Sequence, residues 1–201
     1  MKSIMGMDLA TRESGFCVIP ADWDGDPSAL ICDGVGYDLA GKIPEQSKIQ
    51  AMLNAAKVAV RMFKEHSPAV IGLEAPALHI KSTAASIQVE IGAIVKSQIL
   101  LAADMVPSLV NASTARKFLT GGIRGKRRED RDAGIKVLPA KQQVKNFLTN
   151  RGMVFDTDDQ MDAFVVAFYL YCVVNQHIPC EFAPIEEHEQ IGPPSKRRTA
   201  G

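Results

Sequence analysis

The chain has 201 residues, 46% of them hydrophobic and 23% charged, and its formal net charge is zero. This balance is ordinary for a globular protein with a buried core, and the length fits one domain with a tail. A neutral chain carries no overall signal for nucleic acid, so any such signal must be local.

The four cysteines form no CxxC pair and no signal peptide precedes them, so we expect reduced thiols in a cytosolic-type compartment and no zinc site. The most apolar run, residues 164–174, is far shorter than the roughly 20 residues of a membrane span, and we expect no membrane partner.

The N-terminal third of the chain predicts three strands and a helix. Apolar runs at residues 3–7 and 16–19 flank a turn-like segment, which is typical of a β-hairpin. Residues 30–39 predict an irregular or edge strand, because two glycines interrupt them. Residues 46–66 carry apolar side chains at helical spacing on one face, and a long helix is therefore expected after the strands.

Strands and helices alternate in the rest of the chain. Short strands are predicted at residues 69–73 and 106–110, with a long helix at 82–103 between them. Beyond them we expect a helix at 113–119, a charged loop at 123–136, a helix at 141–150 and a last helix that follows an acidic start at 156–159 and runs to about residue 175. This order predicts an α/β fold around a mixed central sheet flanked by helices. We expect one domain over residues 1–178 and a disordered tail at 179–201.

Acidic residues occupy unusual positions in this pattern. Asp8 ends the first apolar strand, Glu74 ends another strand just before Pro76, and Asp159 and Asp162 begin the last helix. Carboxylates at strand ends point into the crevice where open α/β sheets bind ligands, and residues three apart on a helix share a face. Each position alone has an ordinary explanation, as a solvated strand end or a favourable charge at a helix N-terminus. Together they predict a site for Mg²⁺ or Mn²⁺, because a hard cation relieves the repulsion between converging carboxylates.

Three segments resemble motifs of one nuclease family. IMGMDLATRESG at residues 4–15 resembles the first motif of the RuvC-type Holliday junction resolvases, which belong to the RNase H-like superfamily. IGLEAP at residues 71–76 is similar to their second strand with its glutamate, and DDQMDAFVVA at residues 158–167 is similar to their terminal acidic helix. The order and spacing of these segments also match, over residues 1–175. The resemblance implies an RNase H-like fold and an endonuclease that hydrolyses DNA to leave a 5′ phosphate.

The resemblance also implies roles for single residues. The implied metal ligands, for two Mg²⁺ ions or Mn²⁺ in their place, are Asp8, Glu74, Asp159 and Asp162, with Asp158 as the alternative to Asp159. These four carboxylates and Lys141 are the implied catalytic residues. Arg116 and Lys141 align with basic positions of the family near the scissile phosphate. Arg116 replaces a lysine there, which keeps the charge and changes the geometry.

Two features depart from the family pattern. The family has an aromatic residue shortly after the glutamate that helps to open the junction. Ala75-Pro76-Ala77 lacks it, so that Leu78 or His79 would have to substitute. Residues 121–138 form an insertion. Both departures bear on the preferred substrate more than on the chemistry.

A basic segment accompanies the predicted site. Residues 116–145 contain ten lysines and arginines against three acidic residues, a local net charge of +7. Phosphate contact is the natural use of such a segment, and a solvated charged loop is the ordinary alternative. The predicted DNA-binding residues are Arg116, Lys117, Arg124, Lys126, Arg127, Arg128, Lys141 and Lys145.

Taken together, these features predict a Mg²⁺-dependent endonuclease that resolves four-way DNA junctions by paired symmetric nicks, in DNA recombination and repair. A junction has approximate two-fold symmetry, so we expect a homodimer and no nucleotide cofactor. The helix at residues 82–103, rich in small side chains, is the candidate dimer element, and ordinary packing on the sheet is the equal alternative. We expect the protein in the cytoplasm or in the compartment that holds the DNA, and a phage or organellar origin is a hypothesis.

Three other functions stay open. Another RNase H-like nuclease, acting on flaps, branched replication intermediates or RNA–DNA hybrids, would share the chemistry. An actin-like ATPase or phosphotransferase would need a second glycine-rich phosphate loop, and none is visible between residues 106 and 159. A non-catalytic binder of branched DNA is disfavoured by the intact acidic set.

Overall fold

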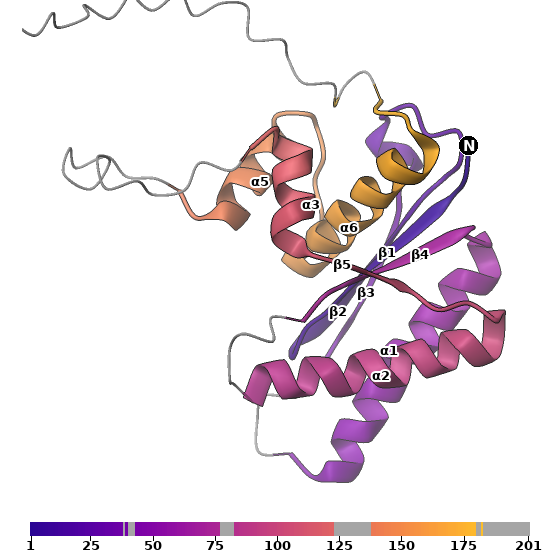
Figure 1. The fold of residues 1–201 in the computed structure, drawn as a ribbon. Coiled ribbons are helices and arrows are strands. Elements are labelled where there is room, and N and C mark those ends of the chain that lie inside the picture. The colour runs from indigo at the N-terminus through magenta and orange to yellow at the C-terminus, as the bar shows by residue number, and fades with distance from the viewer. Residues whose placement is uncertain (38, 40–42, 77–82, 123–137, 180–181, 183–201) are drawn as a thin grey trace, which may run out of the picture.

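The computed structural model describes residues 1–37, 39, 43–76, 83–122, 138–179 and 182, and every structural statement below concerns these residues. They form a five-stranded sheet with helices on both faces (Figure 1). The charged loop at residues 123–136 and most of the tail at 179–201 lie outside the described residues. The domain boundary and the disorder of the tail therefore stay predictions.

The sheet is mixed, with the strand order β3-β2-β1-β4-β5. β1 (Ile4–Leu9), β2 (Glu13–Ile19) and β3 (Ile31–Gly36) form an antiparallel meander, and β4 (Val70–Glu74) and β5 (Ser108–Val110) extend it in parallel to β1. The predicted α/β fold around a mixed sheet is confirmed. β3 lies at the edge as predicted, but it is regular, because each of its residues pairs with one of β2.

Two layers of helices enclose the sheet. On one face lie α1 (Glu45–His66) and α2 (Thr83–Ala103), which pack against each other. On the other face α6 (Asp158–Asn175) crosses the central strands β1 and β2, and α3 (Ala112–Thr120) and α5 (Ala140–Thr149) lie outside it. A short 3-10 helix, η1 (Pro27–Ala29), precedes β3. The helical periodicities of the sequence thus correspond to real elements.

Strand alternation separates the core into two halves. Met5, Met7 and Phe16 point to the α1–α2 face, whereas Ile4 and Cys17 point to the α6 face. Because successive side chains of a strand point to opposite faces, the even-numbered residues of β1 all face α6. Asp8, the one acidic residue of β1, is therefore directed toward α6 and away from α1 and α2.

Glycines in three central strands let α6 approach the sheet closely. A Cβ at Gly6 would lie 2.1 Å from the Ala163 carbonyl oxygen, and a Cβ at Gly15 would lie 2.1 Å from the Asp159 carbonyl oxygen. At Gly72 it would lie 2.4 Å from a side-chain atom of α6. Real Cβ atoms essentially never come within 3.0 Å of such atoms. The N-terminal half of α6 therefore rests directly on the backbone of β1 and β2, which a side chain at these positions would prevent.

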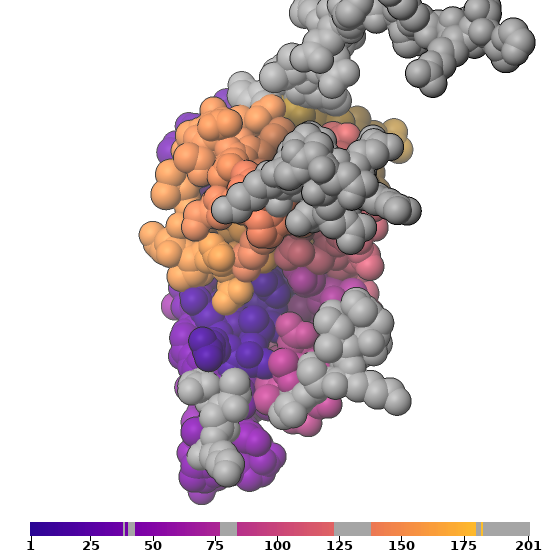
Figure 2. All heavy atoms as spheres, turned by 90° about the vertical axis from the view of Figure 1, so that its left-hand side faces the viewer, coloured from indigo at the N-terminus to yellow at the C-terminus, as the bar shows by residue number. Residues whose placement is uncertain are grey.

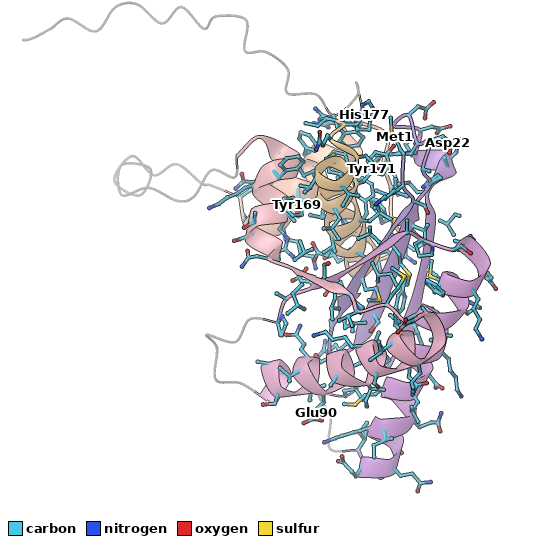
Figure 3. The ribbon with its side chains drawn as sticks, turned by 45° about the vertical axis from the view of Figure 1, so that its right-hand side comes forward. Met1, Asp22, Glu90, Tyr169, Tyr171 and His177 are labelled. Atoms are coloured by element: carbon cyan, nitrogen blue, oxygen red, sulfur yellow. The ribbon has the colours of Figure 1, made fainter. Side chains whose placement is uncertain are left out.

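The C-terminal half of α6 is held by an aromatic cluster. Trp23 packs edge-to-face on Phe164, Phe168 and Tyr171 of α6, with ring centroids 5.8–6.1 Å apart. The Tyr171 hydroxyl donates a hydrogen bond to the Trp23 carbonyl oxygen at 3.0 Å, and Figure 3 shows Tyr171 at the same end of the molecule as Asp22. Edge-to-face pairs of this kind contribute about 0.5–1.5 kcal/mol each beyond area burial. The helix that carries Asp159 and Asp162 is thus anchored along its length.

α2 is apolar on its outer side as well as its inner side. Residues Ala84–Ala103 have a mean hydropathy of 1.3, so by length and composition alone this helix could cross a membrane. That is weak evidence, because core helices of soluble proteins pass the same test. Ile87, Ile91 and Val95 are buried against the sheet, but Leu101 is 81% exposed. The prediction that no membrane partner exists stays a prediction, and the outer face of α2 is a candidate contact surface.

Candidate metal centre

Three carboxylates from three elements meet at one end of the sheet. Asp8 lies in β1, Glu74 is the last residue of β4, and Asp162 lies in α6. One oxygen of each lies within 4.8 Å of the other two, and no other acidic, histidine or cysteine group of this kind occurs in the described part of the chain. β1 and β4 are parallel neighbours, so their ends lie side by side. The predicted convergence of Asp8, Glu74 and Asp162 is therefore present in the structure.

The start of α6 directs Asp162 into this cluster. The Thr157 side chain caps the helix by accepting a hydrogen bond from the Gln160 backbone N–H at 3.2 Å. Gly15, which pairs with Asp8 across β1 and β2, lies under Asp159. Asp162, one turn further on, is consequently buried over the end of β1, with 2% of its surface exposed.

Burial and mutual repulsion make the cluster costly without a cation. Burial raises the pKa of Asp8 well above its ordinary value. The negative charges of Glu74, Asp162 and Asp159 add to this rise, and the positive charge of Lys141 opposes it. Burial likewise raises the pKa of Glu74 to about 7, although Arg116 opposes that rise. Both shifts mean that the metal-free site favours the protonated forms of Asp8 and Glu74. A divalent cation would reverse this preference.

Asp159 and Asp158 lie beside the three clustered carboxylates and are not part of that group. Asp159 is half-buried, and burial raises its pKa despite the opposing charge of Lys141. The charge of Asp159 also adds to the raised pKa of Asp8. The side chain of Asp158 is half-exposed and contacts Lys141 and Lys145, at 3.6 and 3.3 Å. Of these two residues, Asp159 is the one placed to serve as a further metal ligand, and its role stays a prediction.

Two basic residues contact the carboxylates directly. Arg116 of α3 approaches Asp162 at 2.9 Å and Glu74 at 3.6 Å, and Lys141 of α5 approaches the other oxygen of Asp162 at 3.0 Å. Burial opposes the charged form of both groups, but the carboxylates, Asp162 above all, outweigh it and raise the pKa of each. The sequence predicted both residues near the site. It did not predict that they would act as counterions of Asp162.

The remaining predicted DNA contacts are only partly described. Lys117 and Lys145 are exposed on α3 and α5, the two helices that carry Arg116 and Lys141. Arg124, Lys126, Arg127 and Arg128 lie outside the described residues, as do Leu78 and His79. Figure 2 shows the indigo residues of the N-terminal strands between the orange region of α5 and α6 and the magenta region of α2. The N-terminal strands thus border α5 and α6 on an exposed face of the molecule.

Tyr37 is a residue of the site that sequence reasoning missed. Its hydroxyl donates a hydrogen bond to the Ala10 carbonyl oxygen at 3.0 Å and contacts the fully buried Ser14 hydroxyl closely. Burial raises the pKa of Tyr37, with Asp159 and Asp8 adding to the rise, while the Ser14 hydrogen bond opposes it. These two contacts of the Tyr37 hydroxyl therefore stabilise the turn between β1 and β2 beside the carboxylates. Its position after an edge strand offers no signal in the sequence.

Comparisons with known proteins support this picture through the fold. No protein-family model matches the sequence, and no curated protein matches it in sequence. The structure of Thermus thermophilus RuvC superimposes with a TM-score of 0.61, covering 87% of this chain and 96% of RuvC at 11% identity. The chain has the RNase H-like fold of RuvC.

Two further solved structures are similar to this chain. T. thermophilus RuvC in complex with a Holliday junction substrate gives a TM-score of 0.60 at 9% identity, over 87% of this chain and 96% of that one. The yeast mitochondrial Holliday junction resolvase Ydc2 gives 0.45 at 14% identity, over 88% and 81%, a similarity too low to carry an argument. At these identities the likeness shows the fold, and the chemistry must be argued from the residues.

The donor set fits a divalent cation. All three clustered groups offer carboxylate oxygens, the ligands that Mg²⁺ and Mn²⁺ prefer. Buried carboxylates without a cation are unfavourable, and the two basic side chains that contact the cluster offset only part of its charge. The residues present are therefore compatible with a bound metal ion in the RuvC fold.

Proposed function

We propose that this chain is a Mg²⁺-dependent endonuclease that resolves four-way DNA junctions. The observation that carries the proposal is the cluster of Asp8, Glu74 and Asp162, with oxygens within 4.8 Å, at the end of the central strands of a RuvC fold. The RuvC structure with a Holliday junction substrate supports branched DNA as the ligand class. No other group of potential metal ligands competes for this role within the described ranges.

The residues of the site would have different roles in phosphodiester hydrolysis. Asp8, Glu74 and Asp162 would hold the cations. Asp159, whose charge adds to the raised pKa of Asp8, would be a further ligand. These residues would thereby supply the site with a cation's chemistry, which is a lower pKa for an attacking water and stabilisation of the leaving 3′ oxygen. Lys141, once its contact with Asp162 loosens, offers a positive charge to the phosphate as negative charge builds up on it.

Paired nicks in a two-fold symmetric junction call for two active sites related by symmetry. A homodimer supplies them, and its partner surface would be the outer face of α2, where Leu100 and Leu101 are exposed. Exposed apolar side chains favour association with an equivalent surface of a second copy. The enzyme would act wherever its DNA lies, in the cytoplasm or in an organelle.

A second candidate function is an RNase H-like nuclease specific for flaps, branched replication intermediates or RNA–DNA hybrids. It uses the same acidic cluster, and the absence of an aromatic side chain at Ala75-Pro76-Ala77 favours it over a close copy of the resolvases. An actin-like ATPase is the weaker third candidate, since it needs a second phosphate loop. Nothing in the acidic cluster distinguishes these substrates.

The test is cleavage of a labelled synthetic four-way junction beside duplex, flap and RNA–DNA hybrid controls, with Mg²⁺ and with EDTA. Symmetric, metal-dependent nicks in the junction alone are the expected result. Cutting of flaps or hybrids in preference would transfer the function to the second candidate. Tight junction binding without any cleavage would contradict an enzymatic role, and ATP turnover would favour the third candidate.

A further inference from the structure

A cavity of about 290 Å³ opens directly beside the acidic cluster. Asp8 and Glu74 form part of its wall, and the rest comes from β1, β4, β5, the residues after β4, and α2. Its apolar lining is made up of Leu9, Leu73, Ala75, Pro76, Val89 and Leu109. The cavity therefore begins at the carboxylates and continues along the face of α2.

Two polar side chains of α2 line the same cavity. They are Gln88 and Lys96, and in the part of the chain that the structure describes neither has a hydrogen-bond or ion-pair partner. Gly92 lies between them on the helix, and a Cβ there would be 3.8 Å from Leu73. The cavity thus has apolar walls together with an amide and an ammonium group free to contact a ligand.

The size and position of the cavity limit what it can hold. Pockets for small molecules span about 300–1,000 Å³, so this one accommodates a single small ring system and not a stretch of duplex. A phosphodiester at Asp8 and Glu74 places the sugar and base of its own nucleotide next to the cavity mouth. Enzymes that take a base out of the stack hold it between apolar side chains and read its edge with hydrogen bonds. The lining described above offers both kinds of contact.

We propose that this cavity binds one unpaired nucleobase of the strand whose phosphodiester lies at the acidic cluster. This inference rests on the proposed nuclease function and adds a determinant of where the enzyme cuts. Val89 and Pro76 contact the faces of the base, and the Gln88 amide donates to and accepts from its edge. Lys96 contacts the neighbouring sugar–phosphate, which positions the strand without reading its sequence.

The first experiment removes the base from the DNA. After the cut is mapped, junctions with a single abasic nucleotide at each position around it are bound to the full chain, with Ca²⁺ in place of Mg²⁺. Loss of one specific base contact is expected to weaken binding at least about fivefold at one position and not at its neighbours. 2-Aminopurine at that position is expected to gain fluorescence on binding, because the base leaves the stack. Equal affinities at every position would overturn the inference.

The second experiment fills the cavity. Val89 is 45% exposed, so Val89→Trp projects into the cavity without disturbing the core. The matched control is Glu90→Trp on the same helix, because Glu90 is exposed and lies outside the cavity lining (Figure 3). The readout is the ratio of affinities for intact and abasic junctions, in which a change of overall charge cancels. Val89→Trp is expected to bring this ratio to one while Mn²⁺ affinity and Tm stay unchanged, and Glu90→Trp is expected to keep it.

The two proposals fail in different ways. A wild-type protein that cleaves the junction with no dependence on any single base refutes the base site and leaves the nuclease intact. A wild-type protein that neither binds nor cleaves branched DNA refutes both. The wild type can also show the base dependence while Val89→Trp keeps the wild-type ratio of affinities for intact and abasic junctions. The base then binds elsewhere, and the assignment to this cavity is overturned.

Discussion

Replacing Gly15 by alanine tests how the fold assembles the metal centre. The added Cβ would lie 2.1 Å from the carbonyl carbon and oxygen of Asp159 and 2.4 Å from the Gln160 backbone nitrogen. Widening the shortest contact from 2.1 Å to the 3.0 Å that real Cβ atoms require moves the start of α6 by about 0.9 Å. The obstacle is backbone, so no side-chain rotation relieves it. Asp162, one turn along α6, moves with that backbone away from Asp8.

The expected cost follows from overpacking. Forcing an extra methyl group into a packed site destabilises by about 1–3 kcal/mol. For a chain of this size that corresponds to a fall in Tm of roughly 2–12 °C, at 2–4 °C per kcal/mol. Metal affinity is expected to fall as well, because the three carboxylates no longer converge. The assays are thermal unfolding by circular dichroism and Mn²⁺ binding by calorimetry.

Gly36 provides the matched control, because a Cβ there meets nothing within 4 Å. Gly36→Ala changes the same residue type in the neighbouring strand β3 and is expected to leave both Tm and Mn²⁺ affinity close to those of the wild type. If Gly15→Ala and Gly36→Ala behave alike in both assays, the close approach of α6 to β2 does not position the acidic cluster, and the reasoning is refuted.

Four further predictions concern the charged groups and the thiols. Asp8→Asn or Glu74→Gln is expected to abolish junction cleavage while junction binding, measured by mobility shift, survives; retained cleavage with saturating Mg²⁺ would defeat the ligand assignment. Arg116→Gln is expected to tighten Mn²⁺ binding several-fold by calorimetry, because Arg116 competes with the cation for two carboxylates; weaker binding would mean that Arg116 mainly orients them. The pKa of Glu74 is raised from 4.5 to about 7, so between these pH values the folded state binds more protons than the unfolded state. The free energy of unfolding of the metal-free protein, measured with urea, is therefore expected to fall as pH rises from about 5 to about 7. An increase over this range would contradict the raised pKa. Cys17 and Cys32 face each other across β2 and β3, with their sulfur atoms 3.0 Å apart. Oxidation by diamide is expected to join them in a disulfide, which mass spectrometry detects as the loss of two hydrogen atoms. The Cys32→Ser variant is expected to show no such loss.

The sequence determined the elements and the chemical character of the site. Period-two and helical spacing located the strands and helices, since these patterns are local and follow from backbone geometry. Carboxylates at the ends of apolar strands, as at Asp8 and Glu74, indicate a cation site, because burying such groups without one is unfavourable. These inferences need only neighbouring residues. The structure confirms the fold, and it brings Asp8, Glu74 and Asp162 together.

Tertiary structure alone decided which groups touch. Asp159 and Asp162 are equivalent in the sequence pattern, yet only Asp162 joins the cluster, because the contact of α6 with Gly15 sets the rotation and height of the helix over β1. The pairing of Arg116 with Asp162 joins residues 46 positions apart. The cavity beside Glu74 exists only where β4, β5 and α2 meet. Distances between elements far apart in the chain depend on how whole surfaces pack, and no local periodicity encodes them.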